Sequence, residues 1–246
     1  NKKYSEAEEL AIRTTEKFPE NQFGWKALGV LYEKSGKIDS AIEAHETAIL
    51  LSPEDYETHN NLGITYQKSR RLEEAKSSYI KALELKPDSV ECLTNLGVVF
   101  KDLGKFVEAE SQYRLALEID PNSSAAHNNL GIALKKMSRP GEAVTSYMQA
   151  IVTDADNHEA YSNLINMLTY VTFEEDNVRL QEIINTILQK ENAVRPKDIA
   201  SSIVSLLRLS PTIKKNLGDK RCLSPIENPQ EVASELLSLP LLISLM

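Results

Sequence analysis

KALGVLY at residues 26–32, NNLGITY at 60–66, TNLGVVF at 94–100 and NNLGIAL at 128–134 share one pattern in this 246-residue chain. Each stretch begins 34 residues after the one before it, and each carries a Leu-Gly pair at the same place. Alanines and prolines recur with the same period: Ala41, Ala75, Ala109 and Ala143; Ala48, Ala82, Ala116 and Ala150; Pro19, Pro53, Pro87 and Pro121. A fixed period of this length is typical of stacked helix pairs.

Each recurring residue has a physical reason in a helix pair. Small residues let two helices approach closely, and a proline ends the second helix and presets the next turn. Gly36 and Gly104 lie between the two helices of a unit, where a tight turn favours a residue that tolerates positive φ. One pair cannot bury its apolar side alone, so the units must stack. The period predicts helix pairs near 22–53, 56–87, 90–121 and 124–155, after a single helix over 3–18.

These motifs resemble the tetratricopeptide repeat. The first full unit carries Trp25, Leu28, Gly29, Tyr32, Ala41, His45, Ala48 and Pro53, and the next three repeat most of these positions. The resemblance implies an all-α fold, a right-handed α-solenoid of antiparallel helix pairs. The resemblance also implies that the solenoid covers residues 1–170. This solenoid would comprise a half repeat, four full repeats and the first helix of one further repeat: 1–21, 22–55, 56–89, 90–123, 124–157 and 158–170. Because the half repeat lacks its first helix and residue 1 is not Met, we expect a portion of a longer protein.

The repeat pattern ends after Ile165, which replaces the glycine of the motif. Residues 171–246 read as irregular helices, and we interpret them as a segment that caps the solenoid or joins it to another domain. The run Leu236–Met246 has more apolar surface than a cap requires. We expect it to pack on residues 197–209, to self-associate with a second copy, or to form the edge of a following domain.

Composition excludes several classes of function. The net charge is −8 and no run of Lys or Arg exceeds two residues, which argues against nucleic acid as a partner. The chain contains no stretch of eighteen apolar residues, which is about the length that a membrane-spanning helix needs, so we expect no membrane span. Cys92 and Cys222 form no disulfide framework, so a reducing, cytoplasmic location is the default. We find no catalytic set, no metal-ligand spacing and no phosphate loop, and therefore expect no enzyme activity in this chain and no cofactor.

One row of asparagines is the candidate binding site. It recurs on the predicted first helices, with apolar and basic residues beside it: Asn61, Asn95, Asn129 and Asn163; Ile64, Val98 and Ile132; Lys68 and Lys136. An amide offers one acceptor and two donors, which match the C=O and N–H of an extended peptide. The row resembles the asparagine ladder in the repeat arm of the O-linked N-acetylglucosamine transferases. The alternative is that each amide bonds a neighbouring repeat and only staples the stack.

The sequence therefore predicts a protein-interaction module that holds an extended peptide or partner segment in the concave groove of the solenoid. Two alternatives stay open. The chain could be the substrate-recognition arm of a larger transferase, glycosyltransferase-like or a SAM-dependent methyltransferase, whose catalytic domain lies beyond Met246. It could also be a purely structural scaffold.

Overall fold

The computed structural model describes residues 2–168 and Leu180, and within this part it contains helices and no strands. The helices are α1 (Lys2–Lys17), α2 (Gln22–Lys34), α3 (Ile38–Leu51), α4 (Tyr56–Lys68), α5 (Leu72–Leu85), α6 (Val90–Asp102), α7 (Phe106–Ile119), α8 (Ser124–Lys136), α9 (Pro140–Thr153) and α10 (His158–Leu168). Their bounds lie within about two residues of those expected from the 34-residue period, so the prediction of an all-α helical repeat is confirmed. The capping or junction segment predicted over 171–246, including Leu236–Met246, lies outside the described residues apart from Leu180.

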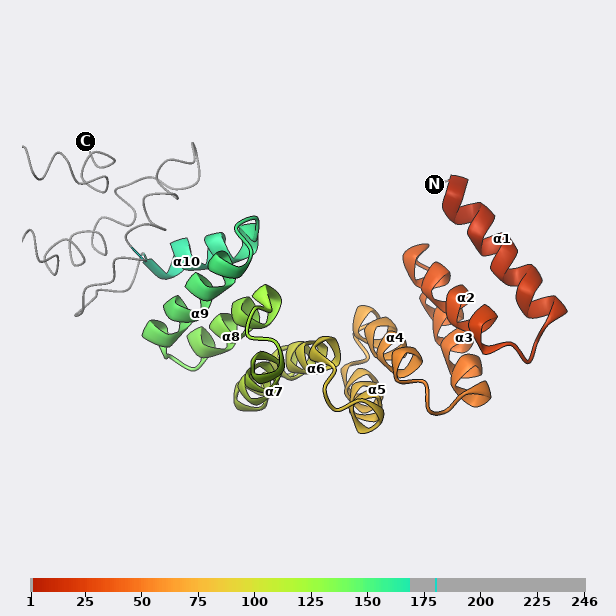
Figure 1. Ribbon diagram of the computed structural model, residues 1–246, viewed down its shortest axis with the longest axis horizontal. Coiled ribbons are helices and arrows are strands. Elements are labelled where there is room, and N and C mark those ends of the chain that lie inside the picture. The colour runs from red at the N-terminus through yellow and green to blue at the C-terminus, as the bar shows by residue number, and fades with distance from the viewer. Residues whose placement is uncertain (1, 169–179, 181–246) are drawn as a thin grey trace, which may run out of the picture. The chain divides into compact units, whose positions relative to one another are not determined.

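The chain divides into two compact units, residues 1–137 with α1–α8 and residues 138–246 with α9 and α10. In the first unit we call α2, α4, α6 and α8 the first helices and α1, α3, α5 and α7 the second helices. The first helices α2, α4 and α6 each pack on the helix before and the helix after them in the chain, and α8 packs on α7. Successive first helices also contact one another (Figure 1). In the second unit, α9 packs on α10.

Glycines of the repeat motif make the helix pairs possible. A Cβ at Gly29 would lie 2.5 Å from the ring of His45, and one at Gly63 would lie 2.7 Å from the ring of Tyr79. These contacts are made between the two helices of one repeat, and the distances are too short for a Cβ atom to be accommodated. Glycine is therefore required by close approach of the partner ring, as the sequence pattern indicated.

The core runs through the stack rather than filling one central volume. One cluster contains Ile42 from α3, Leu62 and Tyr66 from α4, Ala75 and Tyr79 from α5, and Leu96 and Val99 from α6. Because each helix contributes to the packing of both its neighbours, the first helices are held in register with one another. This register positions the predicted ladder.

In each of the four full repeats, the turn between the two helices contains one residue with positive φ. Gly36 has φ +78° and Gly104 has φ +75°, as the sequence predicted, but Arg70 and Ser138 occupy the same position at φ +61° and +58°. A side chain at positive φ costs free energy. The packing of α4 on α5 therefore holds Arg70 in a conformation that its own preferences disfavour.

Candidate binding surface on the first helices

The predicted ladder residues of the first unit lie on three consecutive first helices. Asn61 is on α4, Asn95 on α6 and Asn129 on α8, and each side chain is half-buried. The neighbouring Ile64, Val98 and Ile132 are also half-buried, whereas Lys68 and Lys136 are exposed. Because α4 contacts α6 and α6 contacts α8, these residues belong to one row, which we call the ladder face. Asn163 is half-buried on α10, in the second unit.

Asn61 has a side-chain amide without a hydrogen-bond partner among the described residues. The hydrogen bond that Asn61 accepts from a side chain within the described part involves its backbone: the backbone carbonyl oxygen accepts from Thr65 Oγ1 at 2.9 Å. The side chain is half-buried and keeps one acceptor and two donors available. Of the three ladder residues in the first unit, Asn61 therefore has the most unused hydrogen-bonding capacity.

Asn95 uses part of its amide to join two repeats. Its Nδ2 donates to Oδ1 of Asn60 at 3.3 Å, and Nδ2 of Asn60 donates to Oε1 of Glu91 at 3.0 Å. Asn60 is buried, with 5% of its surface exposed. The ladder residue thus supports a buried neighbour on α4, as the stapling alternative expects, while no hydrogen bond within the described part occupies its own Oδ1.

Asn129 is engaged on both sides of its amide. Lys101 Nζ donates to Oδ1 of Asn129 at 3.3 Å, and Nδ2 of Asn129 donates to the carbonyl oxygen of Ala125 at 3.0 Å. Neither Asn60 nor Lys101 is predicted from the sequence as a partner of the ladder. The Asn-Asn pairs at 60–61 and 128–129 were an available signal, because they place a second amide beside the ladder position.

Charged side chains near the ladder face pair across neighbouring first helices. Lys26 Nζ on α2 lies 3.0 Å from Oδ2 of Asp55 and also bonds Glu57. Lys68 Nζ on α4 lies 2.6 Å from Oε1 of Glu33 on α2. Burial lowers the pKa of Lys26, but its hydrogen bonds to Glu57 and Asp55 outweigh that effect and raise the pKa above its ordinary value. The predicted contact residue Lys68 therefore already has an anionic partner.

Three residues at one repeat position anchor the inter-repeat turn instead of forming a chemical site. Trp25 Nε1 donates to the carbonyl oxygen of Pro19 at 2.8 Å. Nε2 of His59 lies 2.9 Å from the carbonyl oxygen of Pro53, and Nε2 of His127 lies 2.9 Å from that of Pro121. Because a carbonyl only accepts, Nε2 carries the proton in both histidines. Among the described residues, no group of three or more His, Cys, Asp or Glu side chains could hold a metal ion.

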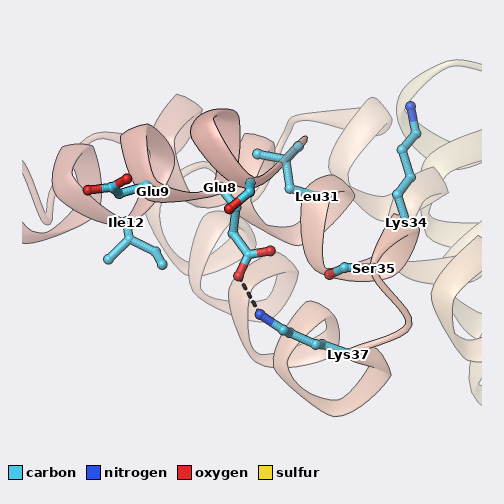
Figure 2. A pocket seen from close by; sticks show the side chains of 8 residues that line it. Glu8, Glu9, Ile12, Leu31, Lys34, Ser35 and Lys37 are labelled. Atoms are coloured by element: carbon cyan, nitrogen blue, oxygen red, sulfur yellow. Dashed lines mark hydrogen bonds and ion pairs between the residues drawn. The ribbon is translucent and has the colours of Figure 1, made fainter. Parts of the chain in front are cut away.

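A pocket lies between α1 and the end of α2, apart from the ladder (Figure 2). It is lined by Ser5, Glu8, Glu9, Ile12, Leu31, Lys34, Ser35 and Lys37. Figure 2 shows the carboxylate of Glu8 turned toward the ammonium of Lys37, with which it forms an ion pair. The carboxylate of Glu9 pairs with Arg13 at 2.6 Å. The acidic groups of the pocket are thus matched within the protein, and none of the ladder asparagines lines it.

Comparisons with known proteins identify the repeats. Models of the tetratricopeptide repeat match residues 25–55, 54–122 and 113–145. A comparison with curated protein sequences gives no match. In the part of the chain that the structure describes, no helix has both the length and the apolar character needed to cross a membrane.

Several solved structures are similar to this chain. MamA AMB-1 is 27% identical, with a TM-score of 0.54 over 63% of this chain and 84% of MamA. YrrB, described as a TPR protein with an unusual peptide-binding site, is 18% identical, with a TM-score of 0.57 over 83% of this chain and 94% of YrrB. TTC0263, a TPR protein of Thermus thermophilus, is 20% identical, with a TM-score of 0.56 over 67% of this chain and 90% of TTC0263. The last two likenesses show the fold alone.

Proposed function

Because residues 25–145 of this chain belong to the tetratricopeptide repeat family, we propose that it is a protein-binding module that holds an extended peptide along the ladder face. The backbone of the peptide would bond the amides of Asn61 and Asn95. Its side chains would contact Ile64 and Val98 beside them.

The observation that carries this proposal is the half-buried amide of Asn61, which has no partner among the described residues. A polar group that is partly withdrawn from water gains most from a partner that supplies both an acceptor and a donor. An extended peptide supplies both at every residue. The unused Oδ1 of Asn95 on the next first helix continues the same set of bonds, whereas Asn129 has less capacity left.

Stapling of repeats and ligand binding are compatible at Asn95 but separable at Asn61. The substitution Asn61→Ala removes no hydrogen bond that the described part of the protein makes with this side chain. Asn95→Ala removes the bond to Asn60 and leaves a buried amide oxygen without that donor. The two variants therefore have different expected effects on stability.

The test selects peptides from a displayed library of random twelve-residue sequences on the full chain and measures their affinity by fluorescence anisotropy. Asn61→Ala should raise Kd about fivefold, as expected for loss of about 1 kcal/mol of hydrogen bonding, with an unchanged melting temperature. Asn95→Ala should raise Kd and also lower the free energy of unfolding by about 1 kcal/mol.

Asn122→Ala is the matched control, because Asn122 is exposed in the turn between α7 and α8, away from the ladder. It should change neither affinity nor stability. If no peptide is enriched, or if Asn61→Ala binds the selected peptides as tightly as the unmodified chain, the proposed function is wrong.

A further inference from the structure

We propose that Phe23, Ala27 and Val30 on α2 form the apolar end of the ladder face and receive a large, uncharged apolar side chain of the bound segment. We call these three residues the α2 patch. This inference rests on the proposed function and adds the chemical class of the ligand and the end of the face at which it is anchored.

Phe23 is exposed without a structural reason in the repeat. Its exposed fraction is 76%, and the same repeat position holds Glu57, Glu91 and Ala125 in the following units. Packing of the stack therefore does not need an aromatic residue there. An exposed aromatic ring costs free energy in water, which a contacting partner recovers.

The other two residues of the α2 patch, Ala27 and Val30, occupy the same repeat positions as residues of the ladder face. Ala27 occupies the position of Asn61 and is exposed, and Val30 occupies the position of Ile64 and is half-buried. Residues spaced by four and three positions lie along one side of a helix. Since α2 contacts α4, the row of hydrogen-bonding amides on α4 and α6 gives way on α2 to an apolar surface.

Charges around the patch argue that its occupant is uncharged. Lys26 lies next to Ala27 in sequence, but its side chain is only 17% exposed and binds Asp55 and Glu57. Lys68, at the other end of the α4 row, binds Glu33. Lys34, which is exposed on α2 four residues after Val30, also interacts with another group of the protein. A charged group of the ligand would have to compete with these pairs, and a neutral apolar group would not. The complementary partner is therefore an extended segment with a large apolar side chain at α2 and its backbone on Asn61.

The experiment uses the full chain and peptides selected from the displayed random library described above. Enriched peptides should share one large apolar residue and lack Asp, Glu, Lys and Arg next to it. Phe23→Ala should raise their Kd about tenfold, through lost aromatic contact area. Phe23→Trp should keep the affinity. Kd should change less than about threefold between 50 and 500 mM NaCl, because screening acts on charges.

Leu50→Ala is the matched control, since Leu50 is an apolar residue on α3 that is 81% exposed outside the ladder face. It should change Kd less than about twofold. A photo-crosslinking p-benzoylphenylalanine in place of Phe23 should attach to the shared apolar residue of the peptide, which mass spectrometry identifies.

The outcomes separate this inference from the proposed function. If Asn61→Ala weakens binding but Phe23→Ala does not, or if the peptides bind through charged residues, only the assignment of the α2 patch is wrong. If neither variant weakens binding, or no peptide is enriched, both proposals are wrong. If Phe23→Ala dissociates a dimer in sedimentation and leaves peptide affinity unchanged, the patch joins two copies of the chain, and the inference is overturned.

Discussion

At the scale of single residues, the motif glycines are fixed by steric contact. The substitution Gly63→Ala should lower the free energy of unfolding by about 1–3 kcal/mol, because its Cβ would lie 2.7 Å from the buried ring of Tyr79. Urea denaturation measures the change. Gly141→Ala on α9 is the control, since a Cβ there meets nothing within 4 Å and should not destabilise the protein. Equal losses in both variants would contradict the steric explanation.

His45 makes the stability of the first unit depend on pH. Its ring is fully buried on α3, neither nitrogen has a hydrogen-bond partner in the described part, and burial lowers its pKa from 6.5 to about 4. Between these two values the unfolded chain binds a proton that the folded chain does not. Stability therefore falls as pH drops from 6.5 to 4, by at most about 3 kcal/mol, and the loss is complete below the folded pKa.

The variant His45→Tyr should remove this contribution to the pH dependence. Tyrosine fits the position, because Tyr79 occupies it in the next repeat against Gly63 and donates from its hydroxyl to Gln67 at 3.1 Å. Glu33 stands at the position of Gln67 in the His45 repeat and can accept the new bond. Denaturation at pH 7, 5 and 4 should show a smaller loss for the variant, and parallel losses would contradict the role of His45.

At the scale of helices, the N-cap of α4 also joins two repeats. Asp55 accepts from the backbone N–H of Glu57 at 3.2 Å and from Thr58 Oγ1 at 2.7 Å, and it pairs with Lys26 of α2. Burial raises its pKa, but the bonds from Thr58 and Lys26 outweigh this and lower it. Asp55→Ala should therefore cost about 2 kcal/mol of stability.

Ser89 caps α6 at the same repeat position and provides the comparison. Its hydroxyl oxygen accepts a hydrogen bond from the backbone N–H of Cys92 at 3.3 Å, and within the described part it accepts no other. Ser89→Ala should cost about 1 kcal/mol, roughly half the loss at Asp55, in the same urea titration. A larger loss at Ser89 would show that the Lys26 pair adds nothing to the cap.

At the scale of the whole molecule, stability should vary along the first unit. In the described part, α1 packs mainly on α2, whereas α4 packs on α2, α3, α5 and α6. In a stack of repeats each element is stabilised by its neighbours, so terminal elements open more readily than central ones. Amides in α1 should exchange with deuterium at least about 100-fold faster than those in α4, measured by mass spectrometry. Equal protection would indicate that the unit opens only as a whole.

For the part of the chain that the structure describes, the sequence by itself determined the helices, their bounds to within about two residues and the helix on which each candidate residue lies. These features depend on local periodicity, and Leu-Gly pairs, alanines and prolines 34 residues apart specify them with little ambiguity. The same register placed Asn61, Asn95 and Asn129 on consecutive first helices. The requirement for glycine at position 63 also followed from the pattern.

Only the tertiary structure decided which amides are free and which charges are already paired. Asn60 with Asn95, Lys101 with Asn129, and Glu33 with Lys68 lie 28 to 35 residues apart in the chain. Such contacts depend on the distance and rotation between two stacked helices. The helical periodicity of a sequence specifies neither of these. The positive φ of Arg70 has the same origin, because packing of both helices closes the turn whatever residue occupies it.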